Sequence, residues 1–205
     1  MKIAIDINDV LRDYTSQFKI YYNKGIDETF EIEDKDINSF DLFEVFPFKD
    51  RNAYNMFRYV DYAFEIYGRA EPMDKMLPYK LNDWAQKTLR DLDEDNVPEI
   101  MIVCPFETGL AIQSTYSFLA KTMTRIREVY FPTDSSKIWD KCDILITANP
   151  NLINNVPEGK TVIKIETSYN IPAESKYSFK SLIDVINDPE ETVIKILTGE
   201  INEQA

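Results

Sequence analysis

Short apolar runs alternate with helical patterns over much of this chain. The first run, Lys2 to Ile7, predicts a buried strand, and four more runs follow at 100–104, 129–131, 144–146 and 162–165. Helical patterns occur at 110–123, 178–187 and 190–198. Because this alternation is typical of βαβ units, we predict an α/β fold with a Rossmann-like parallel sheet.

A long stretch of helical spacing separates the first predicted strand from the second. Apolar residues recur every three or four positions over 10–25, 53–68 and 81–92, whereas 26–49 mixes acidic and aromatic residues. This stretch is too long for an ordinary crossover. We therefore predict a helical cap at 14–96, inserted into a core made of 1–13 and 97–205. The cap would lie over the carboxyl ends of the strands, where open α/β sheets bind ligands.

The composition excludes several kinds of chemistry. The chain has no histidine, which rules out Ser-His-Asp and Cys-His catalysis and every histidine metal site. Its two cysteines, Cys104 and Cys142, are too few for a four-cysteine zinc site. It has five glycines, and none are spaced as in a Gly-rich phosphate loop. Any phosphate chemistry must therefore use carboxylates, backbone amides and a lysine.

Charge and hydropathy bear on partners and location. Lys and Arg number 23 and Asp and Glu number 36, which gives a net charge of −13. This balance argues against nucleic acid or an anionic membrane as the main partner, because both need clustered basic residues. The first residues do not resemble a signal peptide, and no apolar run reaches the roughly 18 residues that cross a bilayer. We therefore expect a cytoplasmic protein.

Polar residues follow three of the predicted strands. Asp6, Asn8 and Asp9 leave the first strand, Cys104 ends the second, and 137–150 surrounds the fourth. Because the carboxyl ends of parallel strands meet at one edge of a sheet, we expect these segments to converge there.

The segment 137–170 has the most specific pattern. Lys137 lies six residues before the run Asp143-Ile-Leu-Ile, and Asn149-Pro, Val-Pro-Glu-Gly, Thr-Val-Ile-Lys-Ile-Glu-Thr and Ser-Tyr-Asn follow in that order. With the other strand ends and the predicted cap, this pattern resembles the haloacid dehalogenase-like (HAD) superfamily. More narrowly, it is similar to the cytosolic 5′(3′)-deoxyribonucleotidases. The resemblance covers most of the chain and is moderate outside 137–170.

The resemblance implies roles for individual residues. In that family an aspartate at the position of Asp6 attacks phosphorus and forms an aspartyl-phosphate. A serine or threonine at the position of Cys104 binds the phosphate, and a lysine at the position of Lys137 neutralises its charge. The family also holds Mg²⁺ at this edge, where Asp6 and the neutral oxygen of Asn149 would be its side-chain ligands.

Two departures from the family pattern weaken these expectations. Asn8 stands where the family has the aspartate that protonates the leaving group, and the loss of a general acid costs about 10²–10⁴ in rate. Thr147 and Ala148 stand where the family has an acidic pair for Mg²⁺, which prefers one or two carboxylates. Asp9 should project differently from Asn8. Asp143 lies about 13 Å from Thr147 at ~3.3 Å per residue, so neither aspartate is expected to substitute.

Three functions remain open. The missing acid and metal carboxylates favour a catalytically degenerate protein with a binding or structural role. Its partner would be another protein, and an Asn/Ile/Lys/Tyr-rich composition is compatible with a phage gene and a place in a virion. The alternative is a Mg²⁺-dependent deoxyribonucleotidase or related phosphomonoesterase that uses Asp6. The third is a non-hydrolytic binder of a nucleoside monophosphate or phosphate, with Phe43, Phe46 or Phe48 as candidates for lining a nucleoside pocket.

Overall fold

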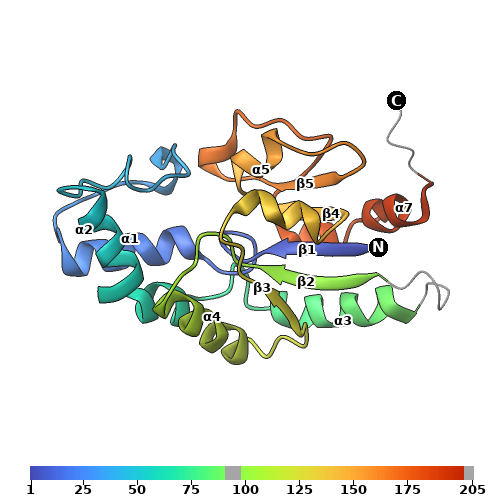
Figure 1. Cartoon of the computed structure of the whole chain (residues 1–205), viewed down its shortest axis with the longest axis horizontal. Helices are drawn as coiled ribbons and strands as arrows, with labels where there is room; N and C mark the ends of the chain where they lie inside the picture. Colours follow the sequence, from blue (N-terminus) through green and yellow to red (C-terminus); the bar gives the residue numbers. More distant parts are fainter. Residues whose placement is uncertain (91–97, 201–205) are drawn as a thin grey trace.

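Parallel strands form one sheet at the centre of the molecule (Figure 1). The computed structural model describes residues 1–90 and 98–200. The strands are β1 (Lys2–Asp6), β2 (Glu99–Val103), β3 (Glu128–Tyr130), β4 (Ile144–Thr147), β5 (Thr161–Ile165) and β6 (Tyr177–Phe179). Their spatial order is β3-β2-β1-β4-β5-β6, which confirms the predicted Rossmann-like parallel sheet.

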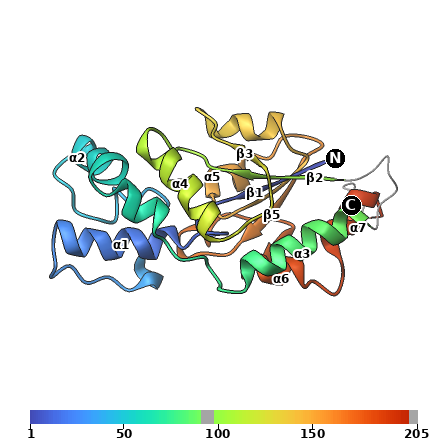
Figure 2. The same ribbon diagram turned by 90° about the horizontal axis from the view of Figure 1, so that it is seen from below.

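Helical segments cover both faces of the sheet. One face carries α3 (Leu77–Arg90), α6 (Leu182–Ile186) and α7 (Thr192–Thr198). Figure 2 shows α3 and α6 side by side. The other face carries α5 (Pro150–Asn154) and the 3-10 segment η4 (Ser135–Asp140).

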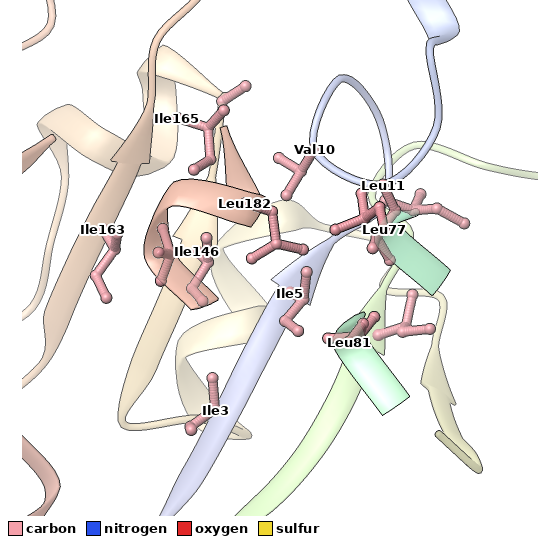
Figure 3. Packing of buried hydrophobic residues seen from close by; sticks show 14 of the residues in the cluster. Ile3, Ile5, Val10, Leu11, Leu77, Leu81, Ile146, Ile163, Ile165 and Leu182 are labelled. Atoms are coloured by element: carbon pink, nitrogen blue, oxygen red, sulfur yellow. The ribbon is translucent and has the colours of Figure 1, made fainter. Parts of the chain in front are cut away.

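Side chains that alternate along each strand separate these two faces. Ile3 and Ile5 of β1 pack in one cluster with Leu81 and Leu182 of the covering helices (Figure 3). Ala4, which lies between them in sequence, belongs to a second cluster on the opposite face. Full burial of each large apolar side chain contributes about 1.5–3 kcal/mol. Because both of their faces are buried, β1, β2, β4 and β5 are largely continuous apolar runs, the signal that predicted them.

A second core lies beyond the carboxyl ends of the strands (Figure 1). Its elements are α1 (Tyr14–Gly25), η1 (Asp34–Asp36), α2 (Arg51–Met56) and the π-helical segments η2 (Phe57–Asp61) and η3 (Phe64–Gly68). We call residues 14–68 the cap. The ring of Phe18 packs 5.1 Å from Phe46 and 5.3 Å from Phe57, measured between centroids. Ala111 of α4 (Leu110–Lys121), the helix between β2 and β3, belongs to the same cluster.

Helix α3 lies inside the cap predicted at 14–96 but packs with the sheet. Leu77, Leu81 and Trp84 belong to the same buried cluster as Ile5 of β1. The cap core, in contrast, uses residues no later than Tyr67, apart from Ala111. The apolar stripe of α3 thus covers the sheet, while the division of the chain into a cap at 14–96 and a core stays a prediction. The predicted boundary at 97 falls outside the described residues.

The first predicted helix begins later than the apolar spacing indicated. Tyr14 is its first residue and Asp13 its N-cap. The preceding residues form a tight turn in which the amide of Leu11 donates to the carbonyl of Ile7 at 3.0 Å. Val10 and Leu11 are buried in the cluster beside the sheet, so their spacing reflects packing of a turn.

Other helical predictions also change in detail. The helix predicted at 53–68 is interrupted at Tyr62, whose φ of −123° and ψ of 20° lie outside the helical region. Strand β6 occupies the start of the helix predicted at 178–187, and α5 was not predicted. The predicted end of the third helix at Leu92 lies outside the described residues. None of the helices in the described part of the chain is long and apolar enough to cross a membrane.

Candidate functional site

A cavity of about 290 Å³ lies between the carboxyl ends of the strands and the cap. This volume is close to the lower end of the range of about 300–1,000 Å³ that is usual for ligand pockets. The core side is lined by Asp6, Asn8, Asp9, Pro105, Phe106, Asn151 and Tyr169. The cap side is lined by Tyr14, Thr15, Phe40, Asp41, Leu42, Arg51, Tyr54, Arg58 and Tyr59.

Asp6 is the last residue of β1 and lines this cavity. Because β4 pairs beside β1, with Ile5 opposite Ile146, Thr147 falls next to Asp6. The Thr147 hydroxyl donates to Asp6 Oδ2 at 2.7 Å, and the buried Asp6 Oδ1 has no hydrogen-bond partner among the described residues. Burial raises the pKa of Asp6 to about 7, against smaller lowering effects of the Thr147 hydroxyl and the Asn8 amide. Asp6 is thus a carboxyl that titrates near neutrality.

Asn8 is held by a buried arginine. Its Oδ1 accepts hydrogen bonds from Arg12 Nε at 3.1 Å and from Arg12 Nη2 at 2.5 Å. Arg12 is fully buried, forms an ion pair with Glu107, and donates to Thr115 Oγ1 at 2.7 Å. An amide at position 8 cannot donate an acidic proton. A carboxylate in its place would be kept ionised by the guanidinium, and would therefore be a poor acid.

The end of β4 carries neutral groups that bond to one another. Thr147 Oγ1 accepts the Asn149 amide N–H at 3.0 Å while its own hydrogen goes to Asp6. Asn149 Oδ1 caps α5 by accepting the Asn151 amide at 3.0 Å. Ala148 is buried in the sheet cluster, the cluster that contains Ile3 and Ile5 of β1. The oxygen of Asn149 that the sequence offered as a metal ligand is therefore already engaged.

The residues at this edge do not fit Mg²⁺. Asp6 is the carboxylate left at the family's metal position, and Asn149 does not line the cavity. Within residues 1–90 and 98–200, no group of three or more His, Cys, Asp or Glu side chains could hold a metal ion. Mg²⁺ requires near-octahedral oxygen coordination, commonly with carboxylates, which this donor set does not supply.

Asp9 lines the cavity but both of its oxygens are engaged. Oδ1 accepts the Thr15 amide at 2.9 Å, and Oδ2 accepts the hydroxyls of Thr15 at 2.6 Å and Tyr169 at 2.9 Å. Burial raises its pKa despite these bonds. Asp9 thus joins the turn after β1 to the first turn of α1 and to the core segment η5 (Ser168–Asn170).

Both predicted phosphate ligands lie away from the cavity. Cys104 is fully buried in the sheet cluster, and burial raises the pKa of its thiol well above the usual range. Lys137 is exposed on η4, and its Nζ lies 3.8 Å from Asp140. Neither lines the cavity, so the structure brings together Asp6 and Asn8 but not Cys104, Lys137 or Asn149. Asp143 pairs with Lys160 at 2.9 Å and does not line the cavity either.

The cap contributes cations that the sequence analysis missed. Arg58 donates to the hydroxyls of Tyr54, at 2.7 Å, and Tyr59, and it stacks 4.2 Å from the centroid of the Tyr59 ring. Arg51 pairs with Asp41 at 2.7 Å. The signal was two arginines seven residues apart, on one side of a helical segment rich in aromatic residues.

The predicted nucleoside-pocket aromatics are not among the lining residues. Phe46 packs in the cap core, and Phe43 and Phe48 pack against it. The aromatic lining comes instead from Tyr14, Phe40, Tyr54 and Tyr59 of the cap, with Phe106 and Tyr169 of the core.

Comparison with known proteins shows a similarity in fold alone. No protein-family profile matches the sequence, and no curated protein matches it either. A crystal structure described, as a provisional assignment, as a haloacid dehalogenase-like hydrolase from Burkholderia xenovorans LB400 superposes with a TM-score of 0.55. The alignment covers 93% of this chain and 97% of that chain, at 7% sequence identity. The HAD-like resemblance is therefore confirmed for the fold, and the deoxyribonucleotidase resemblance stays a prediction.

Proposed function

We propose that this HAD-like scaffold binds a phosphomonoester, such as a nucleoside monophosphate, in the cavity beside Asp6 without hydrolysing it. The cavity lies at the carboxyl ends of parallel strands, where α/β folds bind ligands. Its aromatic lining suits a planar organic group, and its arginines suit an anion. A structural role in an assembly or virion, with a protein partner, stays a prediction.

The hydrogen bonding of Asn8 carries the non-hydrolytic part of the proposal. An alkoxide leaving group needs a proton, and Asn8 has none to give at neutral pH. The buried Arg12 holds the amide oxygen of Asn8 through two hydrogen bonds. The Asn8 side chain is therefore not free to move aside so that another acid could take its place. Asp9, the nearest carboxylate in sequence, is already committed to Thr15 and Tyr169.

The surroundings of Asp6 also disfavour attack on phosphorus. With a pKa of about 7, much of its carboxyl is protonated at neutral pH, and the protonated form is a poor nucleophile. Its ionised form has Oδ2 bonded to Thr147. Among the described residues, no lysine or arginine of the core lines the cavity to offset the negative charge that a phosphate would bring, and Lys137 lies elsewhere.

The test is a paired measurement of binding and turnover. Purified full-length protein is titrated calorimetrically with thymidine monophosphate (dTMP), and inorganic phosphate is assayed with Mg²⁺ or Mn²⁺ present. We expect saturable binding, with phosphate release no faster than that of an Asp6→Asn variant. Release well above that variant, or no binding at all, would contradict the proposal.

Hydrolysis through Asp6 is the second candidate. It is favoured by the place of Asp6 in the cavity lining and by its buried Oδ1, which has no hydrogen-bond partner among the described residues. This function predicts that Asn8→Asp combined with Ala148→Asp raises phosphate release from dTMP above that of the parent. A folded double variant that still binds dTMP but releases no phosphate would rule the candidate out. Thermal unfolding of both proteins checks that the second carboxylate does not disrupt the sheet cluster around position 148.

A further inference from the structure

Arg58 is a cation in the cavity wall that forms no ion pair within the described part of the chain. Its Nη atoms donate to the hydroxyls of Tyr54 and Tyr59, and its buried Nε has no hydrogen-bond partner there. Arg12 and Arg51, in contrast, each form an ion pair, Arg12 with Glu107 and Arg51 with Asp41. Arg58 is therefore a guanidinium poised to bind an anion.

Tyr14 is a second, independent sign of a ligand at the same wall. It lines the cavity, it is 8% exposed, and its buried hydroxyl has no partner among the described residues. Its ring lies 5.4 Å from that of Tyr67, so packing fixes the side chain while the hydroxyl stays unused. Buried hydroxyls are rarely left unbonded, and those that are need an explanation.

The core wall has the opposite character. Asp6 lies near Asp9 and Glu107, whose negative charges add to the burial that disfavours its ionised form. The donor set there fits no Mg²⁺, and Lys137 is not in the cavity. A phosphate beside Asp6 would therefore lie near the carboxyls of Asp6 and Asp9, while no core lysine or arginine among the described residues lines the cavity.

We propose that the ligand is held in the reverse of the orientation that HAD-like hydrolysis requires, with its phosphate bound by Arg58 and Tyr14 of the cap. This inference rests on the proposed function and adds the orientation of the ligand. The phosphate lies against Arg58 and Tyr14, two side chains of the cap lining. Asp6, which lines the core side, is the partner for a hydroxyl at the other end of the ligand.

This orientation narrows the class of ligand. The molecule has one phosphomonoester end, a hydroxyl near the other end, and an apolar or planar part that contacts rings such as Phe40 and Tyr169. A nucleoside monophosphate meets these conditions. Phosphorus is then bound at the cap wall and not beside the carboxyl of Asp6, so the phosphate stays intact even if a general acid is restored.

The first experiment compares dTMP with thymidine, which lacks the phosphate, by calorimetric titration. We expect Arg58→Gln to weaken dTMP binding roughly 10- to 100-fold, and Tyr14→Phe to weaken it about 3- to 10-fold. Neither substitution should change thymidine binding. Arg58→Lys, which keeps the charge but not Nε, should fall between wild type and Arg58→Gln.

Arg69→Gln is the matched control. Arg69 is an exposed arginine that stacks 5.2 Å from the Phe64 ring and does not line the cavity. The Arg69→Gln variant should bind dTMP as tightly as wild type does. If Arg58→Gln and Tyr14→Phe both bind dTMP as tightly as Arg69→Gln, the orientation is wrong while the proposed function stands. Tyr14→Phe keeps the test decisive should Arg58→Gln fail to fold, because it removes only an unbonded hydroxyl.

Asp6→Asn separates the two orientations directly. If the phosphate lies beside Asp6, removal of that carboxylate strengthens dTMP binding several-fold and leaves thymidine binding unchanged. In the reversed orientation both ligands change by the same factor, since Asp6 then contacts a part that they share. A selective gain for dTMP would overturn the inference, and failure of dTMP to bind wild-type protein would overturn the proposed function as well.

Discussion

The two walls of the cavity differ in whether their polar side chains have hydrogen-bond partners within the protein. On the core wall Asn8 is bonded to Arg12, and Asp9 is bonded to Thr15 and Tyr169. On the cap wall, Arg58 and Tyr14 keep donors without partners among the described residues. A buried donor left unbonded costs about 1–3 kcal/mol, so a fold keeps one where something else binds it. In this chain the capacity to bind an anion lies in the cap, while most of the core wall is bonded to itself.

The largest expected effect tests how tightly the core wall is bonded. Glu107→Gln leaves the buried Arg12 without its counterion, and loss of one partner of a buried pair costs about 3–5 kcal/mol. Asp41→Asn breaks the exposed pair with Arg51 on the cap wall, where the cost should be at most about 1 kcal/mol. Urea unfolding at pH 7 gives both values. Equal losses would show that the two walls do not differ in this way.

The pH dependence of stability tests the burial of Asp6. Because its pKa is raised to about 7 in the folded chain from 3.8, the folded chain keeps this proton between these pH values while the unfolded chain has lost it. The free energy of unfolding therefore falls as pH rises through this window. Asp6→Asn should exceed wild type by about 2–4 kcal/mol at pH 8, and this gain should vanish near pH 4. A gain that does not depend on pH would contradict the assignment.

Asp143 provides a control of opposite sign at the other end of β4. Burial raises the pKa of Asp143, but the hydrogen bonds from Lys160 and the Lys2 amide lower it by more, so the net shift is downward. Its contribution to stability is therefore present at neutral pH and is lost as pH falls through the folded pKa. Asp143→Asn should destabilise the protein at pH 7 and have little effect near pH 3, as urea unfolding would measure.

A smaller effect separates the cavity wall from the cap interior. Tyr22→Phe removes a hydroxyl that donates to the Pro47 carbonyl at 2.9 Å, which should cost about 1 kcal/mol. Tyr14→Phe removes an unbonded hydroxyl and should leave the unfolding free energy unchanged or raise it by up to about 1 kcal/mol. Thermal unfolding without ligand compares the two variants. A loss at Tyr14 equal to that at Tyr22 would mean that the Tyr14 hydroxyl already has a partner.

The sheet could be predicted because its signal is local. Ile3, Ile5, Ile144 and Ile146 lie in short runs that are apolar because both faces are buried. The position of Asp6 follows from the same signal, since it ends the first run. Strand β6 was missed because it has three residues, of which Ser178 is exposed.

The cavity could be predicted only on its core side. Asp6 and Asn8 are adjacent to a strand, so topology alone places them, whereas Arg58 reaches the cavity through the folding of the whole cap over the sheet. Spacing also could not tell on which side of a short 3-10 segment Lys137 would emerge. A motif gives only the order of residues along the chain. The direction in which a side chain points depends on tertiary packing, which a motif does not specify.

The smallest expected effect concerns Lys137 itself. Because its side chain is exposed beside Asp140 and does not line the cavity, Lys137→Ala should change the dissociation constant of dTMP by less than about twofold. The HAD-like resemblance makes the opposite prediction, since there the lysine neutralises the phosphate. Calorimetric titration of Lys137→Ala beside Arg58→Gln therefore assigns the phosphate to one wall. A large loss at position 137 with none at position 58 would place it on the core side.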